Sequence, residues 1–233
     1  MARITRKELK TDNFAEEVGL TVTFFEEHQK DMVRYGGIAA AVIVLIAGFV
    51  VYQKHEHSAR QEELSQAIKI QETPVANMSA NGLPVYQTQD AKDQAALKAF
   101  TDLEIKHSGS DEAQIAAYYI GSIRADEGKM ADAEKSFLEA ANHGDKNYAS
   151  LAKSALADVY FAEGQDKKGE DALRDLIGHP TLFVSADQAS IALARHLMGK
   201  NNAEARKLLS DIRNSKSSAA PVAQQLYSQI PPQ

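Results

Sequence analysis

The segment at residues 35–53 constrains this chain more than any other, because it contains no charged residue although charged residues make up 25% of the sequence. As a helix rising about 1.5 Å per residue, the segment would extend roughly 28 Å, close to a bilayer hydrocarbon thickness of about 30 Å. Tyr35 and Tyr52 stand near its two ends, where tyrosine rings favour the headgroup region. The sequence therefore predicts one N-terminal transmembrane helix that contacts lipid.

Two other interpretations of this segment fit the sequence less well. A core helix of a soluble protein seldom runs this far without a polar face. A cleavable signal peptide would need a charged region of 34 residues, and no small-x-small cleavage site follows, because the chain continues as Lys54-His55-Glu56-His57. We therefore expect an uncleaved anchor.

The flanks of the segment differ in positive charge. Residues 1–34 contain six Lys or Arg, whereas residues 54–73 contain three. Short positive flanks stay in the cytoplasm, which predicts a cytoplasmic N-terminus in an inner (plasma) membrane that the chain crosses once. The C-terminal domain would then be periplasmic if the cell is a Gram-negative bacterium.

Composition excludes several classes of function. The net charge of −6 divides into −1 before the span (6 − 7) and −5 after it (20 − 25), so neither part offers a basic surface for nucleic acid. The chain has no cysteine, which excludes disulfides, Cys-ligated zinc and thiol catalysis. We expect neither a nucleic-acid partner nor a cysteine-based site.

A repeat of helical character occupies the C-terminal part of the chain. The segment at residues 73–90 is rich in Pro, Gly and small polar residues and reads as a linker, whereas the chain beyond it is alanine-rich and patterned for helices. Six positions recur at a spacing of 36 residues. They are Ile120-Gly121, Gly128, Ala133, Phe137 and Ala140 in one unit, and Leu156-Ala157, Gly164, Gly169, Leu173 and Leu176 in the next.

The recurring residue types indicate packed helical hairpins. Small residues on both helices of a hairpin allow close approach, and a large residue one turn later, Phe137 or Leu173, would fill the space beside that contact. Gly128 and Gly164 would reverse the chain, where a positive φ is needed. An earlier half-unit fits the same pattern at Ala96, Phe100 and Leu103. A later unit fits it with a slip of about one residue, at Leu193, Leu197, Ala205, Leu209 and Ile212.

This period resembles the tetratricopeptide repeat, which implies an all-α helical-hairpin solenoid. The layout of the whole chain is similar to the YfgM-like ancillary subunits of the Sec translocon, which are single-span proteins with a periplasmic tetratricopeptide domain. That similarity rests on Phe24-Phe25-Glu26-Glu27-His28 before the span, Ser58-Ala59-Arg60 after it, and Ala96, Phe100, Leu103 and His107 at the start of the repeats. The positions matching the repeat itself are Gly121, Ala133, Phe137, Ala140, Leu156, Ala157, Tyr160 and Leu173.

We accordingly divide the chain into four parts. They are a cytoplasmic N-terminal segment (1–34), a transmembrane helix (35–53), a membrane-proximal helix with a linker (54–90), and a tetratricopeptide-repeat-like domain (91–233).

The sequence contains no recognisable catalytic constellation, so we expect a protein that is not an enzyme and uses no cofactor. The stretch from Gly121 to Lys129 superficially resembles a phosphate-binding loop, but Met130 follows where Ser or Thr is required. His55 and His57 would point apart on a helix. The remaining histidines after the span lack partners at catalytic spacing and read as surface or turn residues: His107, His143, His179 and His196.

The resemblance to tetratricopeptide repeats implies a partner-binding wall formed by the first helix of each hairpin. On this chain the wall would include Tyr118, Ser122, Asp126, Asp158 and Phe161, although Tyr118 and Phe161 could equally be core residues. An extended peptide or a partner helix fits such a shallow groove better than a small-molecule substrate.

These features predict a membrane-tethered protein–protein interaction scaffold. The resemblance implies an ancillary factor that links the Sec translocon to exported chains or periplasmic chaperones. The alternative is an envelope-organising repeat protein that coordinates cell-wall or outer-membrane machinery.

Overall fold

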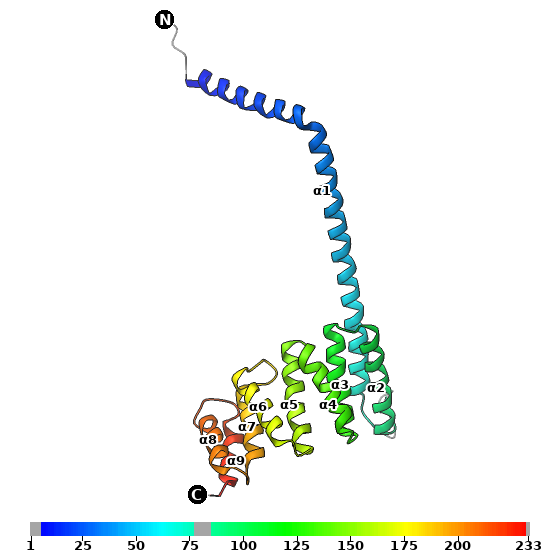
Figure 1. The fold of residues 1–233 in the computed structure, drawn as a ribbon, viewed down its shortest axis with the longest axis vertical. Helices are drawn as coiled ribbons and strands as arrows, with labels where there is room; N and C mark the ends of the chain where they lie inside the picture. The colour runs from blue at the N-terminus through cyan, green and yellow to red at the C-terminus, as the bar shows by residue number, and fades with distance from the viewer. Residues whose placement is uncertain (1–5, 77–84, 232–233) are drawn as a thin grey trace. The chain divides into compact units, whose positions relative to one another are not determined.

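The computed structural model describes residues 6–76 and 85–231, with side chains from residue 33 onward, and this part of the chain is almost entirely helical. The expected all-α fold is confirmed. The helices are α1 (Arg6–Glu72), α2 (Gln89–Lys106), α3 (Asp111–Asp126), α4 (Met130–His143), α5 (Lys146–Ala162), α6 (Asp166–Gly178), α7 (Ala186–Leu197), α8 (Asn202–Arg213) and α9 (Ala220–Gln229) (Figure 1).

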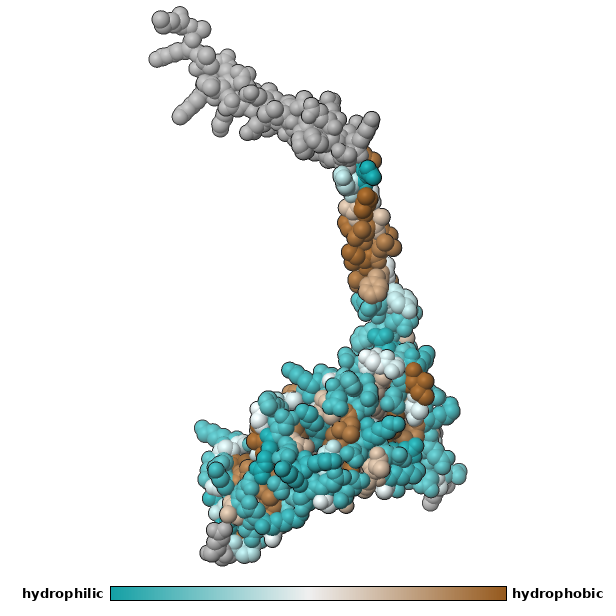
Figure 2. Space-filling model, viewed as in Figure 1, coloured by the Kyte–Doolittle hydropathy of each residue, from teal (hydrophilic) through white to brown (hydrophobic). Residues whose placement is uncertain are grey.

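The chain forms two units, Met1–Ser58 and Ala59–Gln233. In the first unit, helix α1 contains the segment predicted to cross the membrane. Its side chains from Val42 to Ile46 are all exposed, and five consecutive residues more than encircle a helix, so no face of it is covered by protein. Figure 2 shows this stretch as a brown band on its visible side. Among the described residues, this one helix is long and apolar enough to cross a membrane.

The second unit is a stack of antiparallel helical hairpins, in which each helix packs on the next one along the chain (Figure 1). The helices begin where side chains satisfy free backbone N–H groups. The Oγ of Ser110 accepts a hydrogen bond from the Ala113 N–H, and Ser185 and Gln188 form a reciprocal capping box. Gly128 and Gly164 have φ angles of 75° and 73°, which confirms the predicted turns.

The end of α1 belongs to the second unit and supplies the first helix of the first hairpin. Leu64 and Ala67 are buried in one cluster with Phe100 of α2 and Ile123 of α3. Sequence analysis found only half of this hairpin, because residues 54–90 were assigned to a membrane-proximal helix and linker. Beyond α1 the linker includes one isolated parallel bridge between Val75 and Tyr86.

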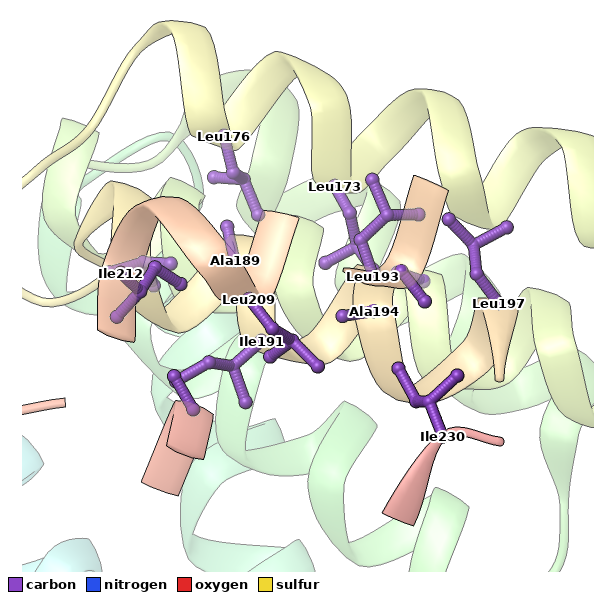
Figure 3. Close-up of a cluster of buried hydrophobic side chains, with 14 residues drawn as sticks. Leu173, Leu176, Ala189, Ile191, Leu193, Ala194, Leu197, Leu209, Ile212 and Ile230 are labelled. Carbon is purple, nitrogen blue, oxygen red and sulfur yellow. The ribbon is translucent and has the colours of Figure 1, made fainter. Parts of the chain in front are cut away.

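The recurring positions contribute to three clusters of buried residues between the helices. Ala96, Ala133 and Ala205 are fully buried, as are the large residues one turn later in the same helices. The slip in the later unit is confined to α7, since Ala205, Leu209 and Ile212 follow Gly169, Leu173 and Leu176 by 36 residues each (205 − 169, 209 − 173, 212 − 176). Figure 3 shows side chains of α6, α7 and α8 packed together in the last of these clusters, which also includes Ile230.

The contacts of the small residues differ between hairpins. A Cβ added to Gly121 would lie 2.7 Å from the ring of Phe137, which confirms the predicted pairing in α3 and α4. In the next hairpin, the space beside Gly169 is filled by the ring of Phe161, to which an added Cβ would come within 2.3 Å. Leu173, which was expected to fill the space beside this helix contact, is buried in one cluster with Ala157 of α5 and with residues of α7 and α8.

Helix α9 covers the open end of the stack. It starts with Pro221 in its first turn, where the missing N–H costs nothing, and it buries Ala223. The guanidinium of Arg206 in α8 donates to the Ile230 carbonyl at 2.7 Å and to the Tyr227 hydroxyl at 3.1 Å. These contacts fix the last helix across the final hairpin.

Candidate functional site

A groove opens between the first helices of two consecutive hairpins, α3 and α5, above α4. Its volume is about 240 Å³. Apolar groups form its floor, and Asp126 and Asp158 stand on its two sides. The residues that line it are Ser122, Ala125, Asp126, Met130, Phe137, Ala155, Asp158, Val159 and Ala162.

Three of the five residues that the resemblance implied therefore meet in one place. Ser122, Asp126 and Asp158 line the groove, whereas Tyr118 and Phe161 do not. The Ser122 hydroxyl donates to the Tyr118 carbonyl at 3.1 Å, so its oxygen remains available as an acceptor at the groove wall.

The two carboxylates of the groove have no counter-charge within the described residues, since no ion pair there includes Asp126 or Asp158. Burial raises the pKa of the Asp158 carboxyl above its ordinary value of 3.8. Asp158 is nevertheless an exposed residue, so the cause is partial loss of water in the groove and not full enclosure. An unpaired, partly dehydrated carboxylate favours an incoming cation.

A row of aromatic rings lies next to the groove and crosses three hairpins. The ring centroids of Tyr118 and Tyr148 are 6.0 Å apart, and those of Tyr148 and Phe183 are 5.4 Å apart, both edge to face. At the other end Tyr119 stacks on Phe100 at 4.8 Å. Burial raises the pKa of Tyr119 to about 12, with a smaller contribution from the neighbouring Tyr148 hydroxyl.

The last ring of this row is held by the loop between α6 and α7. The Leu182 N–H donates to Oδ1 of Asn147 at 3.3 Å, and the hydroxyls of Thr181 and Ser150 are 2.6 Å apart. These bonds leave the Leu182 side chain 85% exposed beside Phe183. Sequence reasoning missed this loop, because its apolar residues lie outside the 36-residue period.

The family comparison agrees with this architecture. The tetratricopeptide repeat-like domain family matches residues 23–181, which is 159 of the 233 residues. The chain belongs to this family. No curated protein and no solved structure matches it significantly. Tetratricopeptide repeats are generally non-catalytic scaffolds for protein–protein interaction, and the position of the groove on the first helices of its hairpins fits that use.

Two histidines of the tetratricopeptide domain are nearly buried. His107 lies in the turn after α2, as expected, whereas His196 lies within α7 and was wrongly expected at the surface or in a turn. The His107 side chain is 9% exposed, and its Nε2 lies 3.0 Å from Glu63 Oε2 at the end of α1. His196 is also nearly buried, and its Nε2 lies 3.2 Å from Asp166 Oδ1. Both histidines hold neighbouring helices together. His143 and His179 are exposed, as expected.

A second cavity of about 340 Å³ lies among α2, α3 and α4. It is lined by charges of both signs, including Glu104, Arg124, Lys135 and Glu139. Burial raises the pKa of Glu104, and the nearby Glu139 carboxylate raises it further.

In the part of the chain whose side chains are described, no group of three or more His, Asp or Glu side chains could hold a metal ion. The stretch from Gly121 to Lys129 is the end of α3 and a turn.

Proposed function

We propose that this protein is a membrane-tethered scaffold that binds protein partners in the groove between α3 and α5. The observation that carries the proposal is the groove itself, which combines an apolar floor with two unpaired carboxylates on a tetratricopeptide stack. Apolar contact supplies affinity, and the charged walls supply selectivity.

The anchor gives the scaffold its physical advantage. The family match runs through residues 35–53 into the hairpins, and the uncharged segment is exposed on all sides of α1. Confining the domain to the membrane that also holds a partner raises their effective concentration, so weak contacts suffice. The excess of Lys and Arg in residues 1–34 supports a cytoplasmic N-terminus and a periplasmic domain at an inner membrane.

The partner that the proposal favours is a component of protein export. The layout of one span followed by a tetratricopeptide domain is similar to ancillary subunits of the Sec translocon, which supports a role in linking the translocon to exported chains or periplasmic chaperones. The competing role is organisation of cell-wall or outer-membrane machinery. The two roles require different neighbours at the same groove.

Site-specific photocrosslinking in cells tests this function. A photoreactive amino acid at Ser122 or Ala125 lies in the groove, and one at Asp171, exposed on α6 and away from the groove, is the matched control. Translocon subunits, exported chains or periplasmic chaperones captured from the groove positions alone support the proposal. Capture of cell-wall synthases or outer-membrane lipoproteins replaces it with the competing role. Equal capture from Asp171 refutes the groove as a binding site.

A reporter fused after Gln233 tests the orientation separately. A reporter that is active only outside the cytoplasm should be active in this fusion. A fusion active only in the cytoplasm would contradict the proposed topology and, with it, partners in the periplasm.

A further inference from the structure

We propose that the groove between α3 and α5 selects a lysine or arginine side chain from a basic segment of the partner protein. This inference rests on the proposed function and specifies the chemistry of its partner. The occupant follows from charge complementarity between the groove and its ligand.

The walls of the groove are negative and their charge is not neutralised. Asp126 and Asp158 form no ion pair among the described side chains, and the nearest cations on the adjoining turn are already engaged. Both Arg124 and Lys129 lie 2.9 Å from the Glu127 carboxylate. An incoming cation therefore meets two carboxylates that form no ion pair, while Arg124 and Lys129 are both held at Glu127.

The C-terminal ends of α3 and α5 also favour a positively charged ligand in the groove. Asp126 is the last residue of α3, and Asp158 lies in the last turn and a half of α5, which ends at Ala162. The C-terminal end of a helix carries a partial negative charge and favours a cation. Two such ends flank the groove.

The floor selects for an aliphatic stem below the charge. Phe137, Val159 and Met130 are the apolar groups of the groove, and Phe137 and Val159 are buried whereas Asp126 and Asp158 are exposed. Lysine and arginine side chains lay their methylene groups on apolar surface while the charged end remains near water or a carboxylate. A glutamate would place a like charge between two aspartates, and a leucine would leave both carboxylates without a partner.

The charge of the whole domain acts in the same direction. Residues 54–233 carry a net charge of −5, which attracts a basic segment over a longer range before it docks. This general attraction is not selective for the groove, so the experiment must separate the two effects.

Peptide binding to the full-length chain in nanodiscs of phosphatidylcholine tests the inference, because a neutral lipid does not attract a basic probe. Three fluorescent peptides share one apolar pattern and carry Lys, Gln or Glu at the same positions. We expect the Lys peptide to bind at least about tenfold more tightly than the Gln peptide, which corresponds to one or two charge-assisted contacts. The Glu peptide should bind weakest.

Matched variants test whether the preference for the Lys peptide depends on the two aspartates of the groove. In D126N/D158N the Lys peptide should bind no better than the Gln peptide, because Asn preserves shape and removes charge. In D171N/D211N, where both aspartates are exposed away from the groove, the preference for Lys should persist at the same net charge. Asp126→Lys, at an exposed position, should abolish the preference for the Lys peptide, because the introduced cation offsets the remaining Asp158 carboxylate.

Three outcomes would overturn the inference. They are equal binding of Lys and Gln peptides to the unmodified chain, an equal loss in D171N/D211N, and an unchanged preference in a folded D126N/D158N. These outcomes leave the proposed function intact if Ser122 still crosslinks a partner in cells. Failure of crosslinking at Ser122 and Ala125 removes the proposed function whatever the peptides do.

Discussion

The ring of Phe161 lies flat against the imidazole of His196, with ring centroids 3.6 Å apart and an angle of 11° between the planes. Phe161 and His196 are the penultimate residues of α5 and α7, so this stack joins the first helices of two neighbouring hairpins. Gly169 of α6 lies on the ring of Phe161 as well. Phe161 is thus held between α6 and α7, and a photoreactive residue at this position would disturb the stack more than report on a partner.

The packing around Phe161 predicts that replacing Gly169 with alanine destabilises the domain. Replacing a helix-interior Gly with Ala ordinarily stabilises a protein by up to about 1 kcal/mol. The Cβ of Gly169→Ala would lie 2.3 Å from the Phe161 ring, so the ring must move, and we expect a loss of about 1–3 kcal/mol. Urea unfolding of residues 59–233 measures the change. Gly178→Ala in the same helix meets nothing within 4 Å and should be neutral or stabilising. Similar effects of the two substitutions would contradict the packing.

A second prediction concerns where the folded domain begins. A fragment starting at Ala59 should unfold cooperatively, whereas one starting at Gln89 lacks the helix that covers Phe100 and Leu103 and should unfold at lower urea. In the longer fragment, Leu64→Ala should cost about 2–4 kcal/mol, because the side chain is buried. Leu182→Ala, at an exposed position, should change stability by less than about 0.5 kcal/mol. Equal stability of the two fragments would show that the end of α1 is dispensable.

The contact between α1 and α2 also predicts a response to acid. A hydrogen bond from Lys106, together with His107, lowers the pKa of Glu63 below its ordinary value of 4.5 despite partial burial. The folded state then binds this proton less tightly than the unfolded state, so the contribution of Glu63 is present above pH 4.5 and is lost as the pH falls through the lowered pKa. Glu63→Gln should flatten the loss of stability below pH 4.5, as urea midpoints across pH would show. Glu62→Gln, exposed on the same turn, should leave that slope unchanged.

For Asp158 we expect the opposite dependence of stability on pH. Because burial raises its pKa above 3.8, the folded state binds this proton more tightly than the unfolded state. The stabilising effect of the protonated form is complete below pH 3.8 and is lost as the pH rises through the raised pKa. The stability of Asp158→Asn relative to the unmodified chain should therefore increase with pH across that window. A difference that stays constant with pH would contradict the dehydration of this carboxylate.

The membrane anchor predicts a response to a single buried charge. Leu45 is exposed at the middle of the uncharged segment of α1. An aspartate at the centre of a transmembrane helix costs about 3 kcal/mol on insertion scales, so Leu45→Asp should increase the fraction of chain extracted by alkaline carbonate. Leu45→Ala keeps the position apolar and should remain with the membrane. Complete extraction of the unmodified chain would rule out a span.

The sequence was informative wherever a property is local or periodic. One such property is the absence of charge over residues 35–53, which involves consecutive residues only. Two others follow from the 36-residue period: the burial of Ala133 and Phe137, and the positive φ angles of Gly128 and Gly164. The resemblance to tetratricopeptide repeats then added Ser122, Asp126 and Asp158 as candidate groove residues, and the structure places all three in one groove.

Only the tertiary structure decided the contacts that fall outside the period. Helix α1 forms the first hairpin with α2, and residues 54–72 lie outside the 36-residue period, so no repeat of sequence marks Leu64 as a core residue. Tyr148 and Phe183 come together because a loop folds back on the start of α5, and Phe161 and His196 meet because the C-terminal ends of α5 and α7 lie side by side. Such pairings depend on the three-dimensional approach of distant segments, which local patterning does not encode.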